Sequence, residues 1–355
     1  MRLTLRRREW AATACALSAA LIAVIYAADP PRHGGAVGSA AEQTGTRGAS
    51  PTDLRRNRVK PARPIWNGDS FRIKAAPTVG GGEGPLPPYR FSSASGPRGG
   101  WFQPHSDSDP AVHGVAMVDD PTGLTRSRSA NSVRQVIKIT ADERRSYAGR
   151  YVRAELQGPP ILGPGDDRWV IAEIYLPKDT PVLPASSSWW TLLSIYGPPF
   201  GSAGPNSIHL ARDSTGPGND LTWPMPSGAV IWRRSATPGV WHIIARRIRF
   251  SSDPAQGFSE IWYSRRDAAG KPTRPLTRQK LRAGGDPPTQ RRYYRTLDPA
   301  INWDGHSRNH ADLKNYHAAH LWPDRTLISV FFARHRVYDG TTPVRAIDPY
   351  YTGLR

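Results

Sequence analysis

The chain has 355 residues, including 35 prolines and 33 glycines, and carries a formal net charge of +19. This length allows one large domain with a sizeable core, and a single cysteine excludes an internal disulfide. The excess positive charge concentrates polyanions near the protein, so the candidate partners are acidic polysaccharide, nucleic acid and anionic membrane.

The N-terminal segment 1–28 has the layout of an export signal. Several arginines within the first eight positions precede an apolar run over 11–28, which matches the charged and apolar regions of a secretory signal peptide or of an uncut signal anchor. We therefore expect the protein to be secreted, or anchored through this segment on the outer face of the cell membrane. Cys15 lies within the segment, so the exported domain should have no thiolate site.

Residues 29–63 are predicted to form a disordered linker. They are rich in Gly, Ala, Ser, Thr, Pro and Arg and show no hydrophobic periodicity, as is typical of solvated segments. The folded domain is expected over 64–355. Its first part, 65–102, places aromatic residues among Pro and Gly, and we expect edge strands and loops there.

The rest of the domain alternates short apolar runs with clusters of Pro, Gly, Asp or Asn, a pattern typical of strands and turns. The expected strands cover 133–140, 151–156, 168–176, 189–196, 207–212, 229–234 and 327–337, with a hairpin over 239–263. We find no long amphipathic helix and no internal repeat. The sequence therefore predicts an all-β domain, a two-sheet antiparallel β-sandwich of the jelly-roll type, in which each sheet buries its apolar face against the other.

Missing motifs argue against several chemistries. The sequence contains no HExxH, CxxC, P-loop or GxSxG, and the GGGEG run at 80–84 continues into Pro-rich sequence where a nucleotide loop would need a helix. We therefore expect that no cofactor is required. Asp166 and Asp167 offer the carboxylates of a structural Ca²⁺ site, and the alternative is an ordinary GDD turn.

Three stretches of the chain resemble the heparin lyase-like polysaccharide lyase family, which has a concanavalin A-like jelly roll related to alginate and glucuronan lyases. They are RAEL at 153–156 with GDDRWVIAEIYLP at 165–177; GVWHIIARRIRFSSDPAQGFSEIWY at 239–263; and LKNY at 313–316 with RHRVYDGTT at 334–342. The resemblance implies an exported lyase that cleaves an acidic, uronate-containing polysaccharide by β-elimination. It also implies that the 239–263 hairpin, with Trp241 and Trp262, is mainly framework.

β-Elimination beside a uronic acid requires a group that neutralises the carboxylate, a base for the neighbouring proton and an acid for the leaving oxygen. The resemblance places Arg153 in the groove, and its planar guanidinium suits a carboxylate. Glu155 follows two positions later, on the same strand face, and would orient that arginine. The alternative is a surface ion pair with no role in substrate binding.

Tyr316 in LKNY resembles the lyase tyrosine that gives and takes the proton. A free phenol has a pKa of about 10, so a nearby cation must make it a competent base. Lys314 and His317 are the expected neighbours, although the spacing from Lys to Tyr is shorter than in the family pattern. The alternative is an exposed strand tyrosine without chemistry.

The strand at 189–196 departs from the family, whose members often have Gln-x-His-Gly where this chain has Ser194, Tyr196 and Gly197. The resemblance suggests His209 in SIHLAR as a shifted substitute for the missing histidine, and the alternative is a structural or solvent-facing histidine. The predicted catalytic residues are Arg153, Tyr196, His209 and Tyr316. The predicted substrate-binding residues are Glu155, Ser194, Lys314 and His317.

Other functions stay open on the sequence. The missing Gln-x-His pair fits a non-catalytic carbohydrate-binding module of the same fold. A glycoside hydrolase is less favoured, because its chemistry needs two carboxylates across the scissile bond and no E-x-D-x-x-E strand is present. Nucleic-acid binding is not favoured either, because the arginines are scattered without an RRM, OB-fold or helix-turn-helix signature.

Overall fold

The computed structural model describes residues 59–69, 72–73, 89–92, 102–103, 114–123, 135–144, 151–156, 158–159, 161–184, 189–196, 206–225, 229–267, 269–283, 286–297, 309–322, 324–325 and 327–353. The predicted signal segment 1–28 and most of the predicted linker lie outside these residues. The backbone amides of Val59 and Ala62 donate hydrogen bonds to the carbonyls of Tyr351 and Ala346 at 3.1 and 2.9 Å. The folded domain therefore includes the last residues of the segment 29–63 that was predicted to be linker.

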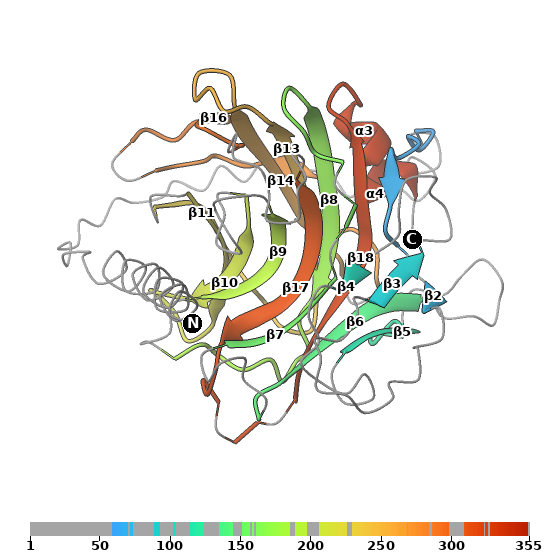
Figure 1. The fold of residues 1–355 in the computed structure, drawn as a ribbon, viewed down its shortest axis with the longest axis vertical. Coiled ribbons are helices and arrows are strands. Elements are labelled where there is room, and N and C mark those ends of the chain that lie inside the picture. The colour runs from blue at the N-terminus through green and yellow to red at the C-terminus, as the bar shows by residue number, and fades with distance from the viewer. Residues whose placement is uncertain are drawn as a thin grey trace, which may run out of the picture. The chain divides into compact units, whose positions relative to one another are not determined.

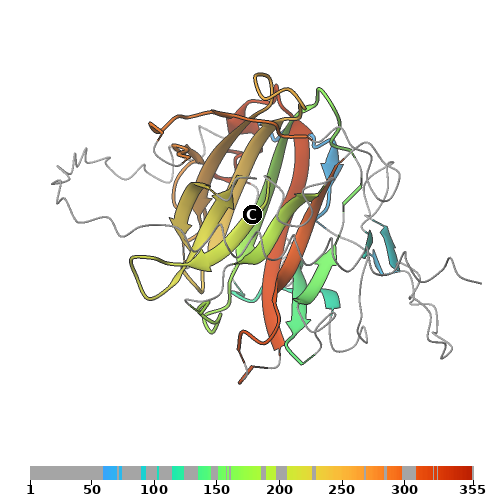
Figure 2. The same ribbon diagram turned by 60° about the vertical axis from the view of Figure 1, so that its left-hand side comes forward.

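The larger of two antiparallel sheets has nine strands, and we call it the back sheet (Figures 1 and 2). Its order is β15-β14-β13-β8-β18-β6-β5, with β1 paired to β18 and β16 paired to β14. Its strands are β1 (Trp66–Asn67), β5 (Gly114–Asp119), β6 (Gln135–Asp142), β8 (Asp167–Tyr175), β13 (Trp241–Arg249), β14 (Phe258–Arg265), β15 (Thr277–Arg278), β16 (Arg292–Tyr293) and β18 (Leu327–Asp339).

The second sheet has six strands in the order β12-β11-β10-β9-β17-β7, and we call it the front sheet. Its strands are β7 (Tyr151–Leu156), β9 (Trp190–Tyr196), β10 (Ile208–Arg212), β11 (Asn219–Pro224), β12 (Val230–Ser235) and β17 (His310–Ala318). In Figure 1, β9, β10 and β17 bend around the side of this sheet that faces away from the back sheet. A small third sheet contains β2 (Arg72–Ile73), β3 (Tyr89–Ser92) and β4 (Phe102–Gln103).

The hydrophobic core lies between the back and front sheets, because alternate residues of each strand point into this space. Ile137 and Ile139 of β6 enter it from the back sheet, and Leu193, Ile208 and Leu210 enter it from the front sheet. Each of these side chains is at most 1% exposed. Burying one such side chain contributes about 1.5–3 kcal/mol. The predicted all-β, two-sheet antiparallel sandwich is therefore confirmed.

The outer face of the back sheet is covered by the C-terminal segment. Trp169 and Ile171 of β8 pack with Ile243 of β13 and with Ile347, which lies in α3 (Val344–Ile347). A second short helix, α4 (Pro349–Thr352), follows directly. No helix in the described part of the chain is long and apolar enough to cross a bilayer.

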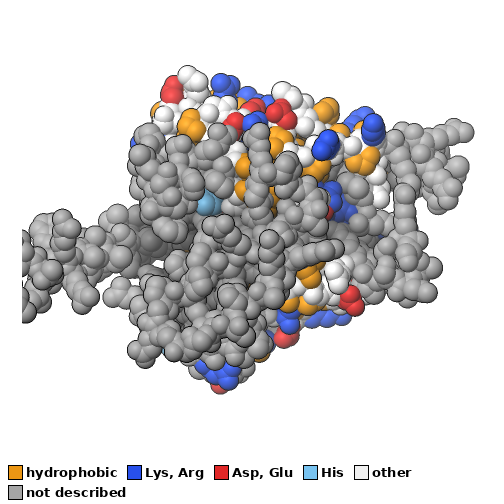
Figure 3. All heavy atoms as spheres, turned by 45° about the vertical axis from the view of Figure 1, so that its right-hand side comes forward, with side chains coloured by type: hydrophobic (Ala, Val, Ile, Leu, Met, Phe, Trp, Pro, Cys, Tyr) orange, Lys and Arg blue, Asp and Glu red, His pale blue; other side chains and the backbone are white. Residues whose placement is uncertain are grey.

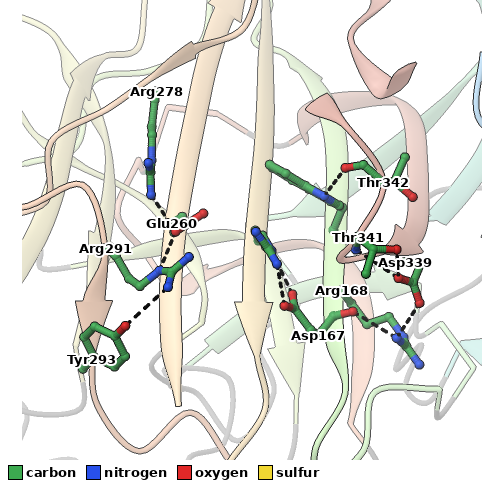
Figure 4. Close-up of polar contacts among 11 residues, drawn as sticks. Asp167, Arg168, Glu260, Arg278, Arg291, Tyr293, Asp339, Thr341 and Thr342 are labelled. Atoms are coloured by element: carbon green, nitrogen blue, oxygen red, sulfur yellow. Dashed lines mark hydrogen bonds and ion pairs between the residues drawn. The ribbon is translucent and has the colours of Figure 1, made fainter. Parts of the chain in front are cut away.

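Ion pairs connect neighbouring strands on this outer face (Figure 4). Arg247 of β13 donates to both carboxylate oxygens of Asp167 on β8, at 3.0 and 2.7 Å. Glu260 of β14 accepts from Arg278 at 2.6 Å and from Arg291 at 2.5 Å. Figure 3 shows another view, in which scattered Lys, Arg, Asp and Glu side chains lie among hydrophobic and other side chains of the described residues.

The 239–263 hairpin forms the adjacent strands β13 and β14 near one side of the back sheet. Trp241 is 2% exposed and its ring lies 5.4 Å from that of Tyr175. The Trp262 ring packs against Trp169 at 4.6 Å, at an interplanar angle of 60°. Both tryptophans lie in the back sheet, away from the outer face of the front sheet, as expected for framework.

Every run predicted to be a strand corresponds to a strand whose ends differ by at most two residues from the prediction. The sequence analysis did not identify β5, β11, β15 and β16, and it recognised β17 only through LKNY at 313–316. Strand β11 reads NDLTWP, and its two polar residues at the start and Pro at the end resemble a loop. Pairing with β10 over 219–222 and with β12 over 220–224 makes this segment a strand.

Candidate active site

The outer face of the front sheet carries a row of polar residues, one from each strand. Residues paired across neighbouring strands share a face, so the register defines the row. The row consists of Arg153, Tyr316, Thr191, His209, Thr222 and Arg233. Neighbouring strands lie about 4.8 Å apart, so the backbones of Tyr316 and His209 are separated by roughly 10 Å. Within the row Thr191, His209 and Thr222 are at most 5% exposed, and Tyr316 is half-buried.

A buried charge cluster lies beside this row. The Lys314 ammonium is 2.7 Å from a Glu155 carboxylate oxygen and 3.6 Å from an Asp312 carboxylate oxygen. Lys314 and Glu155 pair directly in the register of β17 and β7, and Asp312 precedes Lys314 by two positions, so all three share one face. Each side chain is at most 7% exposed. The sequence analysis named Glu155 and Lys314 but missed Asp312, although its D-x-K spacing on a strand was the available signal.

Asp312 differs from an ordinary aspartate in its protonation. Burial raises its pKa to about 7, the nearby Glu155 carboxylate acts in the same direction, and Lys314 opposes the shift. Its other oxygen accepts a hydrogen bond from the backbone amide of Gly158 at 3.3 Å. A carboxyl group with this pKa can give or take a proton near neutral pH.

His209 is neutral at neutral pH. Burial, with a smaller effect of the Lys314 charge, lowers the pKa of its imidazole to about 4. Nδ1 lies 3.4 Å from the Thr191 hydroxyl, whereas Nε2 has no hydrogen-bond partner within the described part of the chain. The side chain is 5% exposed and lies on the face opposite the hydrophobic core. Within the row, His209 therefore has a buried ring nitrogen without a hydrogen-bond partner among the described residues.

Tyr316 is half-buried, and its ring packs edge-on against Trp189 at 4.8 Å. Its strand register places it between Arg153 on one side and Thr191 on the other. Tyr196 pairs with His310 at the end of the same face. The structure does not describe the side chains of Arg153 and Tyr196. These two residues are therefore assigned to the site only by their positions on β7 and β9.

Ser194 also belongs to this face, where it pairs with Asp312 in the register of β9 and β17. Its hydroxyl accepts a hydrogen bond from Ser207 at 3.4 Å, and its side chain is buried.

His317 lies on the opposite face, contrary to the prediction that it binds substrate next to Tyr316. The side chain is buried in the interior, where the imidazole packs against Trp190 and Trp322. Its Nε2 is 3.3 Å from a Glu143 carboxylate oxygen. Successive residues of a strand point to opposite sides, so the position after Tyr316 cannot share its groove.

The GDD segment forms an ordinary turn held by arginines. Asp166 accepts from the Gly163 amide at 2.7 Å and from Arg168 at 2.6 Å, and Asp167 is paired with Arg247. Both carboxylates are therefore already engaged with donors, which argues against the structural Ca²⁺ considered from the sequence. Over the described ranges, no group of three or more His, Cys, Asp or Glu residues could hold a metal ion.

Comparisons with known proteins do not assign the chain to a family. No family model and no curated protein matches it. Similar solved structures include a GH131 beta-glucanase catalytic domain from Podospora anserina, with 18% identity over 68% of this chain and 86% of that chain and a TM-score of 0.45. Another is the catalytic domain of a glycoside hydrolase family 131 protein from Coprinopsis cinerea. It has 14% identity over 67% of this chain and 82% of that chain, and a TM-score of 0.46. A third is peanut lectin, with 9% identity over 61% of this chain and 96% of that chain, and a TM-score of 0.26.

Proposed function

We propose that this protein binds an acidic, uronate-containing polysaccharide along the outer face of the front sheet and cleaves it by β-elimination. The observation that carries the proposal is the strand register, which aligns Arg153, Tyr316 and His209 on one face. The positive net charge of the chain would favour capture of such a polyanion.

The row can supply the groups that elimination needs. Arg153, directly opposite Tyr316, would bind the uronate carboxylate through its planar guanidinium, so that charge developing on the neighbouring carbon is stabilised. Tyr316 would remove the proton from that carbon and return a proton to the leaving glycosidic oxygen. The C–H bond and the C–O bond both break, and a carbon–carbon double bond forms in the new terminal sugar. The neutral His209 would accept a hydrogen bond from the substrate through its free Nε2.

Hydrolysis is a second candidate, because the carboxylates of Asp312 and Glu155 meet at one ammonium on this face. Asp312 would protonate the leaving oxygen, while the Glu155 carboxylate would act as nucleophile or as base for water. Both groups lie within 3.6 Å of the same Lys314 ammonium. The hydrolysis hypothesis uses the same face of the front sheet as the elimination hypothesis, but the glycosidic bond is broken by water instead of by removal of a proton.

Product analysis separates these readings. The purified protein is incubated with alginate, glucuronan, heparin and hyaluronan, and with a neutral β-glucan as the comparison substrate. β-Elimination produces new reducing ends and an unsaturated uronate that absorbs in the ultraviolet, whereas hydrolysis produces only the reducing ends. Binding without either product would refute both enzymatic readings and support a carbohydrate-binding module.

Substitution of the tyrosine tests its role. In Tyr316→Phe, turnover should fall by about 10²–10⁴-fold, which is the usual contribution of general acid–base catalysis. The matched control is Tyr293→Phe, which removes a phenol that is 52% exposed in the back sheet. Unchanged turnover in Tyr316→Phe would exclude the phenol as the catalytic group. Loss in Asp312→Asn at an unchanged unfolding midpoint, with retention in Tyr316→Phe and no unsaturated product, would favour hydrolysis.

We also propose that the chain is exported through its N-terminal segment 1–28. A polysaccharide of this kind is too large to be delivered through a membrane without a transporter, so an enzyme acting on it outside the cell would need such a segment. Fractionation of cells that express the full chain tests this proposal, and recovery only in the cytoplasm would refute it.

A further inference from the structure

A basic pocket of about 630 Å³ lies between the edges of the two sheets. It is bounded on one side by β12, the edge strand of the front sheet, and on the other by the segment 277–282, which begins with β15 at the edge of the back sheet. Its cationic lining residues are Arg233, Arg234, Arg278, Lys280 and Arg282. The sequence analysis assigned no function to the residues that line this pocket.

The pocket has more cations than the neighbouring carboxylates neutralise. Arg233 is 3.4 Å from Asp220, and Arg278 is 2.6 Å from Glu260. The structure shows no ion pair of Arg234, Lys280 or Arg282 with any described carboxylate. These three positive charges therefore face one cavity without a countercharge, and the repulsion between them would be relieved by a bound anion.

Hydrogen bonds hold the two walls of the pocket in place. The Arg282 backbone amide donates to the Ile231 carbonyl at 2.7 Å and so connects the 277–282 segment to β12. Arg234 donates twice to the Gln279 side-chain oxygen, at 3.2 and 3.0 Å, across the pocket. A preformed site loses little conformational entropy on binding. The backbone walls of the pocket and the Arg234 guanidinium are therefore positioned before a ligand arrives.

The pocket adjoins the end of the polar row, because Arg233 belongs to both. Arg233 is the last member of that row, and Thr222 alone separates it from His209 in the register. Two strand spacings correspond to roughly 10 Å, and four spacings from Tyr316 to roughly 19 Å. A polysaccharide that crosses the front sheet along the row would reach the pocket several sugars away from the reacting bond.

The lining favours an acidic sugar over a nucleic acid. Single-stranded nucleic acids need exposed aromatic rings on which bases stack. Trp232, the aromatic residue that the pocket contains, is 4% exposed and belongs to the core cluster. Arginine and lysine side chains around a polar cavity instead suit compact anionic groups such as carboxylate or sulfate.

We propose that this pocket binds a carboxylate or sulfate group of the polysaccharide that occupies the front sheet, as a site remote from the reacting bond. The identity of the ligand as a polysaccharide rests on the proposed function, whereas the anion site itself does not. Because the pocket is reached only by a long chain, it should improve the binding of long oligosaccharides and leave short ones unaffected.

The test uses the double variant Lys280→Ala/Arg282→Ala, whose side chains are both exposed. Its matched control is Lys271→Ala/Arg274→Ala, which removes the same charge from two exposed positions that do not line the pocket. Binding is measured by calorimetry with short and long oligomers of polyuronate and of heparin, and with single-stranded DNA. Polyuronate carries carboxylates without sulfates and heparin carries both, so a loss seen with heparin alone would assign the pocket to sulfate.

We expect the pocket variant to bind long acidic oligomers at least about tenfold more weakly, which corresponds to about 1.4 kcal/mol. Its affinity for short oligomers should equal that of the control. Equal losses in the pocket variant and in the control, or equal losses for short and long oligomers, would overturn the proposal. A loss confined to DNA would assign the pocket to nucleic acid and overturn it as well. If the protein yields no cleavage product but the length-dependent loss is present, the proposed enzymatic function fails and the anion pocket stands.

Discussion

Replacing Lys314 by Met removes the ammonium that holds two buried carboxylates together. Lys314 lies 2.7 Å from Glu155 and 3.6 Å from Asp312. At an effective dielectric constant of about 20 these separations correspond to Coulomb energies of about 6 and about 5 kcal/mol, before the cost of desolvation. Because desolvation offsets much of this attraction, breaking a buried pair typically costs about 3–5 kcal/mol. That is a large part of a total stability of about 5–15 kcal/mol.

The loss should depend on pH. Asp312 already has a pKa of about 7 because it is buried, and Lys314 is the group that limits this rise. In Lys314→Met the pKa of Asp312 rises further. A carboxyl group whose pKa is raised by folding binds more protons in the folded than in the unfolded state, so stability falls as pH rises from about 4 through the folded pKa. The variant should therefore be more strongly destabilised at pH 8 than at pH 5.

Urea unfolding followed by tryptophan fluorescence measures this difference. With a slope of about 1–3 kcal/mol per molar urea, the midpoint at pH 8 should fall by about 1 M or more. Lys271→Met, at an exposed position, controls for the loss of a charge, and its midpoint should stay within error. Adding Glu155→Gln and Asp312→Asn to Lys314→Met should recover most of the stability. A loss that is the same at both pH values, or below about 1 kcal/mol, would refute the reasoning.

Three further predictions concern the framework. In Glu173→Gln, the buried Arg266 guanidinium loses its carboxylate partner at 2.6 Å. We expect the free energy of unfolding, measured by chemical denaturation, to fall by about 3–5 kcal/mol. A fall as small as that of a surface substitution would contradict a buried pair. In Gly340→Ala, the added Cβ would lie 2.1 Å from an Asp167 carboxylate oxygen. The melting temperature should therefore fall by an amount equivalent to about 1–3 kcal/mol. An unchanged melting temperature would argue against this contact. Burial lowers the pKa of three framework histidines, so their contribution to stability is present above pH 6.5 and is lost as pH falls toward the folded values. They are His242, His317 and His335, with pKa values of about 4, about 4 and about 3. In His242→Asn, the stability difference between pH 7 and pH 5 should shrink by about 2 kcal/mol, and an unchanged difference would show that this imidazole is not buried in the neutral form.

In the candidate site, strand periodicity predicted correctly which face some residues share, but it was not applied to others. Arg153 and Glu155 were assigned to one face because they are two positions apart on a strand, and the observed register agrees with that assignment. The same rule assigns Tyr316 and His317 to opposite faces, so the prediction that both bind substrate was inconsistent with the strand itself. Asp312 was missed because the strand was recognised only from residue 313 onward.

The sequence by itself determined the class of fold, because short apolar runs between Pro and Gly clusters must pair into sheets whose apolar faces require mutual burial. It could not determine which strands are neighbours, since pairing partners can be distant along the chain and depend on the packing of the whole sandwich. Only the tertiary structure brings Tyr316 of β17 and His209 of β10 to either side of Thr191. The same holds for the basic pocket, whose walls come from edge strands of different sheets. The pKa of Asp312 was likewise inaccessible from sequence, because burial and the positions of Glu155 and Lys314 are properties of the folded chain.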